Sequence, residues 1–293
     1  MSRVLAVDLG GTKHASALVD EAGGVTEKRK LPADRSLEGT VSQIADRASG
    51  SGIDRVGIIV PGIYDPRNGT AWAPNLWGWD PVPLRAALER RLSVPATIAS
   101  DRAGYVLGEQ WLGAARGLQD VAFVAVGTGI GVGILSGGRL IEGAHGIAGA
   151  AGWMAVDRAW KPEYERTGCW EWEAAGPAVA RRAGLDSAQA VVEAACKGDE
   201  RAMAALEETA SFLAMGIANL ISILDPDAVI LGGGLMQAGD VLLERIRAHV
   251  PRWAQPIAAR LTRIELTALG EDAGLFGAAR LAFLSGEGSA GIS

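Results

Sequence analysis

The stretch Asp8-Leu9-Gly10-Gly11-Thr12-Lys13 is the most informative segment of the chain for its fold. Residues 3–8 predict a short apolar strand that ends in a carboxylate, and residues 14–19 predict a second strand that returns beside it. A glycine pair in such a turn exposes backbone N–H groups that can bind phosphate, and Thr12 adds a hydroxyl donor. An ordinary Gly-Gly hairpin is the alternative. The stretch is neither a Walker A loop nor a Rossmann fingerprint, because a strand follows it.

Two further glycine-rich stretches extend this pattern along the chain. Gly127-Thr128-Gly129-Ile130-Gly131 links two predicted strands in the same way. Gly232-Gly233-Gly234 follows the buried strand predicted at residues 228–231, where α/β proteins bind ligands, so an adenine or ribose can lie against its backbone. A flexible turn is the alternative for this third stretch. Together the three stretches predict a nucleotide site.

Predicted strands and helices alternate through most of the chain, which indicates an α/β fold with mainly central, buried strands. The recurrence of strand, glycine turn and strand near residue 121 suggests two structurally related halves. A length of 293 residues fits two domains. We predict an N-terminal domain at 1–102, to which residues 279–293 return, and a C-terminal domain at 103–278.

Composition excludes several classes of partner. A net charge of −6 disfavours a non-specific nucleic-acid binder, and no run of about 18 uninterrupted apolar residues indicates a membrane span. No apolar signal-peptide region precedes Asp8, and two cysteines cannot build a disulfide framework. These features predict a cytoplasmic protein that acts on a small molecule.

Taken together and in this order, the motifs resemble those of the ROK family (repressors, open reading frames, kinases) within the actin-like ATPase and sugar kinase superfamily. Residues 8–13 resemble its first phosphate motif, residues 127–131 its second, and Ser100-Asp101-Arg102-Ala103 its Asn-Asp-Ala-Asn-Ala segment. Residues 168–178 resemble its Gly-Cys-Leu-Glu…Gly-Pro-Ala stretch. Residues 224–234 and 272–278 match its adenosine-side signatures. The resemblance covers nearly the whole chain.

The resemblance implies two actin-like, ribonuclease H-like α/β domains with an ATP and sugar cleft between them, and an ATP-dependent kinase. Asp101 would be the catalytic base, although a helix N-cap is the alternative role for this residue. Asp8 would hold Mg²⁺ through water. Family resemblance also suggests a homodimer. The residues implied in binding ATP are Gly10, Gly11, Thr12, Lys13, Gly127, Thr128, Gly129, Gly232, Gly233 and Gly234.

The sequence departs from the family at its zinc loop. The family carries Gly-Glu-Ile-Gly-His and four zinc-binding positions, whereas here residues 149–153 read Gly-Ala-Ala-Gly-Trp and only Cys169 remains of the four ligands. One thiolate cannot make a closed tetrahedral site, so structural zinc is not expected. Four of the nine tryptophans fall in this region, and we expect apolar packing of these side chains to fill the space. They are Trp153, Trp160, Trp170 and Trp172.

The implied sugar contacts have changed as well. Ser100, Ala150 and Trp153 stand where the family has asparagine, glutamate and histidine, while Glu171 remains. A site built for particular hydroxyls discriminates by their presence, so plain glucose is not expected to be the best substrate. For His145 a structural role in its loop is the alternative. The predicted substrate site contains Gly62, Asn75, Ser100, Asp101, His145, Trp153 and Glu171.

The expected substrate is therefore a modified hexose-like molecule of secondary metabolism, including antibiotic biosynthesis. An aminosugar such as kanosamine and a C7-cyclitol of the valiolone type both fit. An ordinary glucokinase is the alternative enzyme. A non-catalytic sugar sensor or transcriptional regulator is the alternative of another class. A repressor is expected to carry a winged-helix domain ahead of the first phosphate motif, whereas here that motif begins within ten residues of Met1.

Overall fold

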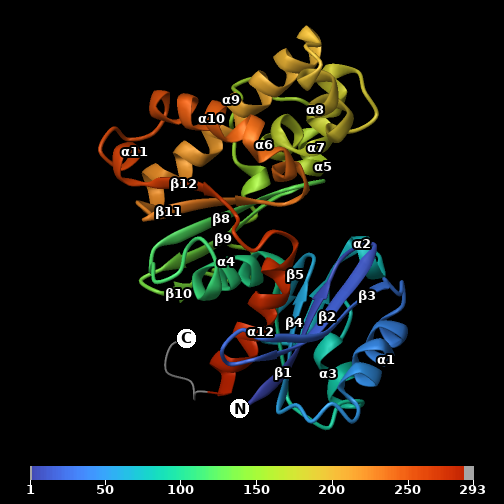
Figure 1. The fold of residues 1–293 in the computed structure, drawn as a ribbon. Coiled ribbons are helices and arrows are strands. Elements are labelled where there is room, and N and C mark those ends of the chain that lie inside the picture. The colour runs from blue at the N-terminus through green and yellow to red at the C-terminus, as the bar shows by residue number, and fades with distance from the viewer. Residues whose placement is uncertain (1, 287–293) are drawn as a thin grey trace. The chain divides into compact units, whose positions relative to one another are not determined.

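The computed structural model describes residues 2–286, and the chain folds into two compact units. Unit 1 comprises residues 1–117, 142–147 and 271–293. Unit 2 comprises residues 118–141 and 148–270. Figure 1 shows the elements of each unit along the coloured chain.

The sheet of unit 1 has five strands in the order β3-β2-β1-β4-β7. β1 pairs antiparallel with β2, and β2 with β3, whereas β1, β4 and β7 run parallel. The parallel strands place Asp8 and Ser100 near the same edge of the sheet, with β4 between their strands. The bounds are β1 Arg3–Leu9, β2 Lys13–Asp20, β3 Val25–Pro32, β4 Arg55–Val60 and β7 Ala96–Ser100.

Helices cover both faces of this sheet. Alternate side chains of β1 point to opposite faces, so Leu5 and Val7 pack in one core with α1 and α3, while Val4 and Ala6 pack with α12. Ser36 caps α1 by accepting a hydrogen bond from the N–H of Gly39. The helices and short elements of unit 1 are α1 Leu37–Ala48, α2 Pro74–Trp77, α3 Leu84–Glu89, α4 Asp101–Leu112 and α12 Ala273–Gly286, with the hairpin β5 Ile63–Asp65 and β6 Thr70–Trp72.

The sheet of unit 2 repeats this topology in the order β10-β9-β8-β11-β12. β8 pairs antiparallel with β9, and β8, β11 and β12 run parallel. Two halves with the same strand order confirm the α/β fold predicted from the sequence. The bounds are β8 Val121–Val126, β9 Ile130–Ser136, β10 Arg139–Leu140, β11 Ala228–Gly232 and β12 Arg263–Leu266.

The long helix α9 lies in the core of unit 2. By length and composition α9 could cross a membrane, but 56% of its most apolar window is buried, as in the core helix of a globular unit. The indole of Trp170 packs against α9 at Gly216, where an added Cβ would lie 2.1 Å from the ring. The helices of unit 2 are α5 Tyr164–Thr167, α6 Cys169–Ala174, α7 Gly176–Ala183, α8 Ala188–Cys196, α9 Glu200–Leu224, α10 Gly239–His249 and α11 Ala258–Leu261, with 3-10 turns η1 Ala151–Trp153, η2 Gly234–Ala238 and η3 Val250–Arg252. A fourth turn, η4 Gly270–Asp272, spans the last boundary between the units.

This division differs from the boundary predicted at residue 102. Helix α4 belongs to unit 1 because its Gly104 and Gly108 let α12 approach closely at Ala273 and Gly277. Unit 1 also includes residues 142–147, and its last segment begins at Glu271 rather than at residue 279. Within the predicted return at 279–293, residues 287–293 lie outside the described residues.

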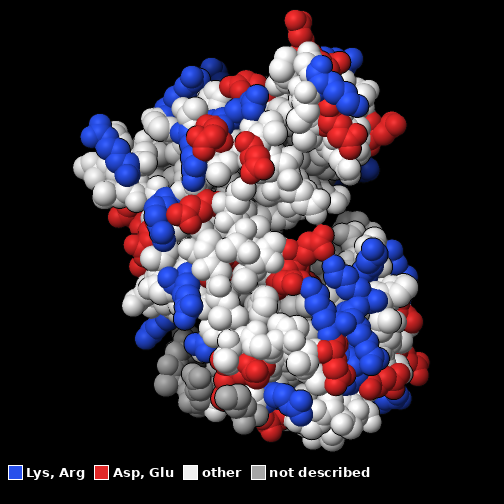
Figure 2. Space-filling model, viewed as in Figure 1, with Lys and Arg blue, Asp and Glu red and all other residues white. Residues whose placement is uncertain are grey.

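Strand β3 was not predicted from the sequence. Its residues Val-Thr-Glu-Lys-Arg-Lys-Leu-Pro are all exposed, so no alternation of apolar residues marks them as a strand. Figure 2 shows Lys and Arg gathered over this edge of unit 1. Charged residues on an edge strand discourage pairing with another chain.

Candidate functional site

Asp8 and the glycine loop after it form one corner of the candidate site. The turn is closed by a 3.0 Å hydrogen bond from the N–H of Gly10 to the carbonyl of Lys13. An added Cβ at Gly10 would lie 2.6 Å from that carbonyl oxygen, and one at Gly11 would lie 3.4 Å from Asn75 Cβ. The loop therefore needs a glycine at position 10, and the structure brings Asn75 to Gly11. Thr12 and Lys13 are exposed.

Asp101 is the first residue of α4, directly after β7. The Ser100 hydroxyl, and not Asp101, accepts the capping hydrogen bond from the N–H of Ala103 at 3.4 Å. The Asp101 Oδ1 accepts a hydrogen bond from the adjacent Arg102 N–H at 2.8 Å. The capping role weighed for Asp101 thus belongs to Ser100.

Both carboxylates are buried, and the charge of Asp101 acts on Asp8. Burial and then the charge of Asp101 raise the pKa of Asp8 to about 7, while Lys30 acts in the opposite direction. Burial raises the pKa of Asp101 to about 6, against the favourable charge of Arg102. A desolvated carboxylate near neutral pKa is suited to take a proton from a hydroxyl.

Tyr105 belongs to this corner and was missed from the sequence. Burial and then the charges of Asp8 and Asp101 raise the pKa of its phenol. The signal that finds it is helical spacing, because Tyr105 follows Asp101 by four residues on α4.

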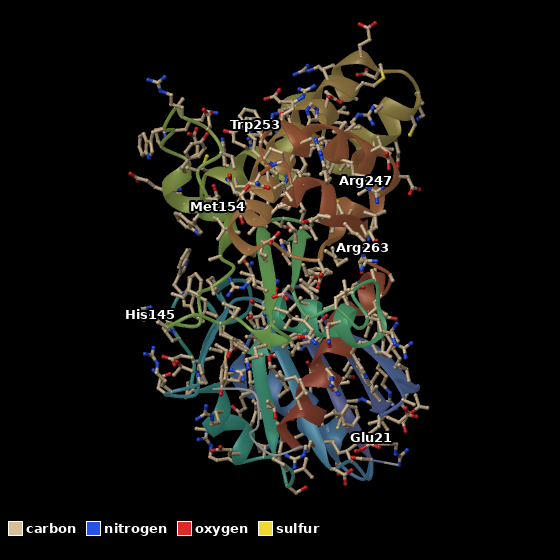
Figure 3. The ribbon with its side chains drawn as sticks, turned by 90° about the vertical axis from the view of Figure 1, so that its left-hand side faces the viewer. Glu21, His145, Met154, Arg247, Trp253 and Arg263 are labelled. Atoms are coloured by element: carbon tan, nitrogen blue, oxygen red, sulfur yellow. The ribbon has the colours of Figure 1, made fainter. Side chains whose placement is uncertain are left out.

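Gly62 and His145 are two further predicted substrate residues of unit 1. At Gly62 an added Cβ would lie 2.2 Å from the carbonyl oxygen of Trp72, so this glycine permits a close backbone approach. His145 is exposed at the edge of unit 1, where Figure 3 labels it. The adjacent Gly146 packs against the carbonyl of Tyr64. The close backbone contact explains why glycine stands at position 62. His145 lies in an exposed loop.

In unit 2 the structure brings two glycine stretches together. The N–H of Gly127 donates to the carbonyl of Gly129 at 2.9 Å, and the N–H of Gly176 donates to the carbonyl of Gly127 at 2.8 Å. An added Cβ at Gly127 would lie 3.7 Å from the N of Gly234, and Gly233 adopts a positive φ of 93° beside Val126. The loop after β8 and the turn after β11 therefore adjoin, as expected for a nucleotide site at strand ends.

Glu171 on α6 lies against the same loop. Its Oε2 accepts a 2.8 Å hydrogen bond from the N–H of Ile130, and an added Cβ at Gly129 would lie 2.5 Å from this oxygen. Burial raises the pKa of Glu171 despite this hydrogen bond. The carboxylate is thus held beside the glycine loop by the backbone.

The tryptophan prediction was wrong for two of the four side chains. Trp170 is fully buried and donates its indole N–H to the carbonyl of Phe212 at 2.9 Å. Trp172 stacks on Arg181 at 3.9 Å. Trp153 and Trp160 are 58% and 65% exposed, because they lie on a short turn and a loop rather than on a helix with a packed face. Apolar packing by all four indoles does not replace the zinc loop.

A hydrogen-bonded carboxylate occupies the centre of that region instead. Buried Glu173 accepts 2.6 Å hydrogen bonds from Tyr164 and from Lys161, and a 2.7 Å bond from Arg182. Burial opposes its ionisation, but these partners outweigh burial and lower the pKa of Glu173. Within residues 2–286, no group of three or more His, Cys, Asp or Glu side chains is arranged to hold a metal ion.

Comparison with known proteins agrees with this geometry. The ROK family model matches residues 4–284. A glucokinase of Halalkalibacterium halodurans is 30% identical, with 92% of each chain covered, and an N-acetylmannosamine kinase of Escherichia fergusonii is 33% identical, covering 95% of this chain and 97% of that enzyme.

Solved structures extend the similarity to three dimensions. A ROK family glucokinase from Streptomyces griseus in complex with glucose and AMPPNP superposes with a TM-score of 0.81 at 31% identity. The alignment covers 97% of this chain and 100% of the other. The family match, the shared fold and the kinase relatives together place this chain in the ROK family, as an ATP-dependent sugar kinase.

Proposed function

We propose that this kinase transfers the γ-phosphoryl group of ATP to the primary hydroxyl of a modified hexose-like acceptor, with Asp101 as the base. Because Ser100 caps α4, the Asp101 carboxylate is not needed for capping. A pKa of about 6 keeps this carboxylate ionised at neutral pH and basic enough to take a proton from the acceptor hydroxyl. Positioning and charge neutralisation supply most of the rate in phosphoryl transfer.

The glycine loops would bind the nucleotide. Residues 10–13 and 127–129 would donate backbone N–H groups to phosphate oxygens, and residues 232–234 would lie against the adenosine. Asp8 suits Mg²⁺ held through water, because a divalent cation would favour ionisation of a carboxylate whose pKa burial and Asp101 have raised. The metal would neutralise charge on the phosphates.

The choice of acceptor rests on the exposed indole of Trp153. A half-exposed indole stands where the resemblance places a sugar-binding histidine, and Ser100 and Ala150 replace two more polar partners. Glu171 remains, held by Ile130. A pocket that has lost hydroxyl partners discriminates against the substrate that needed them.

An aminosugar such as kanosamine or a C7-cyclitol of the valiolone type fits this changed pocket, which would place the enzyme in secondary metabolism, including antibiotic biosynthesis. We also propose a cytoplasmic homodimer. An ordinary glucokinase is the second candidate, because relatives at 30–31% identity carry that activity in their names.

The test is a coupled ADP-release assay across glucose, N-acetylmannosamine, kanosamine and valiolone. We expect kcat/KM for kanosamine or valiolone to exceed that for glucose at least tenfold. Glucose as the best acceptor would establish the glucokinase instead. Absence of turnover with all four would contradict the proposed acceptor class and favour a sensor.

A further inference from the structure

A charged pocket of about 400 Å³ lies in unit 1, away from the corner that holds Asp8 and Asp101. Ser2, which directly precedes β1, and Arg55, which begins β4, both line it. Asp8 lies near the end of β1, and Asp101 follows the end of β7. Because β1, β4 and β7 run parallel, the pocket and the two carboxylates lie at opposite edges of the sheet. We call this site the arginine pocket.

Two arginines and two carboxylates line the arginine pocket without pairing. Arg55 and Arg280 are half-buried, whereas Asp54 and Glu21, which Figure 3 labels, are exposed. Within residues 2–286, none of these four side chains makes an ion pair, and the buried Arg280 Nε has no hydrogen-bond partner. The Arg280 guanidinium lies 5.9 Å from the centre of the Trp111 ring, which supports it from one side. The pocket therefore offers charged groups of both signs to a ligand.

The charges of the lining indicate which ligand would fit. Two guanidinium groups supply several N–H donors and match the oxygens of a phosphate group. The carboxylates would repel a plain anion, but they would attract an ammonium group on the same molecule. The Ser2 hydroxyl already donates to Asp54 at 2.5 Å, so Glu21 is the more available carboxylate. Phe283 lines the pocket as well and offers an apolar face to a carbon skeleton.

Helix α12 connects the arginine pocket to the Asp8 corner. Arg280 lies in the second half of α12, and Gly274 lies in its first turn. An added Cβ at Gly274 would lie 2.2 Å from the Asp8 Oδ2, so the helix begins against this carboxylate. The same helix packs closely on α4, which begins at Asp101. A rigid helix that contacts both places can carry a change at one of them to the other.

We propose that the arginine pocket is an effector site for a small zwitterion that carries a phosphate group and an ammonium group, such as an aminosugar phosphate. The phosphate would lie at Arg55 and Arg280, and the ammonium group at Glu21. If the acceptor is an aminosugar, the product of the enzyme belongs to this class, and that link alone rests on the proposed function. Ligand binding would alter the affinity for nucleotide at Asp8 through α12.

Isothermal titration with glucosamine 6-phosphate tests the site. Glucose 6-phosphate and glucosamine are probes that each lack one of the two charged groups. A saturating nonhydrolysable ATP analogue is present, so that the proposed phosphate loops are occupied. We expect glucosamine 6-phosphate to bind at least about tenfold more tightly than either probe. Arg280→Gln should weaken its binding about tenfold, and Glu21→Gln about threefold without weakening glucose 6-phosphate.

Arg29→Gln and Glu38→Gln are the matched controls, because both side chains are exposed in unit 1 and neither lines the pocket. Both variants should bind glucosamine 6-phosphate within about twofold of wild type. Equal binding of glucosamine 6-phosphate and glucose 6-phosphate would overturn the site. Binding that is absent, or unchanged in both Arg280→Gln and Glu21→Gln, would overturn it as well. If Arg280→Gln does not fold, the exposed Glu21→Gln variant decides the result.

The effector role is tested by titrating the ATP analogue with Mg²⁺ in the presence and absence of glucosamine 6-phosphate. The Kd for the analogue should change at least about threefold in wild type and should stay constant in Arg280→Gln and Glu21→Gln. A constant Kd in wild type, or an equal change in the variants, would overturn the effector role. These measurements need no turnover, so failure of the proposed function would leave the test of the arginine pocket intact.

Discussion

Glu171 on α6 and Ile130 at the start of β9 are joined by a 2.8 Å hydrogen bond from the Ile130 N–H to the Glu171 Oε2. This bond fixes a carboxylate beside Gly129 and Gly152, where a larger residue would collide with it. Glu171, which we propose contacts the acceptor, is therefore hydrogen-bonded to the loop that we propose binds phosphate. Movement at one of these residues is expected to affect both binding functions.

Substitution of Glu171 tests this link. Glu171→Ala should lower kcat/KM by about 10- to 100-fold, or about 1.4–2.8 kcal/mol of transition-state stabilisation, because it removes both the acceptor contact and the brace. Glu171→Gln should lose less, since its amide oxygen still accepts from Ile130. Steady-state kinetics would check this, with Glu193→Ala on α8 as control. A value for Glu171→Ala within twofold of wild type would refute the assignment.

Asp101→Asn tests the base. The amide cannot accept the proton, so kcat should fall by roughly 10²–10⁴-fold while affinity for a nonhydrolysable ATP analogue stays within about twofold. Isothermal titration and ADP release measure the two effects. Asp46→Asn, an exposed change on α1, is the control. Retained turnover in Asp101→Asn would remove Asp101 from the mechanism.

The pH profile gives an independent reading of Asp101. Burial raises its pKa to about 6, and only the ionised carboxylate can take a proton. Therefore kcat/KM should be level above about pH 7 and fall about tenfold between pH 7 and pH 5. Initial rates in buffers of constant ionic strength would show this acid limb. A flat profile across the same range would contradict the role.

In the enzyme without bound nucleotide, the ionised Asp8 carboxylate is expected to lower the free energy of unfolding. The pKa is about 7 in the folded chain against an ordinary value of 3.8, so the folded state binds the extra proton between these values. Stability then falls as pH rises through this window, and Asp8→Asn removes the loss. The pKa shift of Asp8 corresponds to about 4 kcal/mol, and each 1 kcal/mol shifts the Tm by about 2–4 °C. We therefore expect the Tm of Asp8→Asn to be higher by roughly 10 °C at pH 8 and unchanged near pH 4.

The control for Asp8 is Asp65→Asn. Hydrogen bonds from Arg67 lower the pKa of Asp65, so its ionised form is favoured and its loss should give no gain in Tm. Asp8→Asn should also lose most activity, because a neutral amide would bind the proposed Mg²⁺ much more weakly. A lower Tm for Asp8→Asn at pH 8 would show that the carboxylate stabilises the fold.

Glu173 is expected to hold the former zinc loop without metal. Glu173→Ala removes the carboxylate that joins Tyr164, Lys161 and Arg182, each of which keeps a weaker or more exposed partner, and should destabilise unit 2 by about 1–3 kcal/mol. Tyr164→Phe removes one hydrogen bond and should cost about 1 kcal/mol. Chemical denaturation measures both, and a chelator should leave the wild-type midpoint unchanged. One bound zinc per chain in metal analysis would contradict this assignment.

The sequence by itself determined the strand-and-glycine motifs and the family. Each of these depends on residues close together in the chain, where turn geometry and apolar runs act locally. The same reasoning missed β3, whose eight exposed residues carry no apolar alternation and are ordered by pairing with β2. It also placed the domain boundary after residue 102, in the first turn of α4, whereas α12, from the opposite end of the chain, packs on α4 and keeps it in unit 1.

Only the tertiary structure decided what the distinctive side chains do. Ser100 and Asp101 are both good helix caps by residue type, and the backbone geometry at the end of β7 assigns the cap to Ser100. Trp153 and Trp170 have the same chemistry, yet one is exposed in a pocket and the other is buried against Gly216. Burial and hydrogen bonding depend on atoms brought together from distant segments, and no local pattern contains that information.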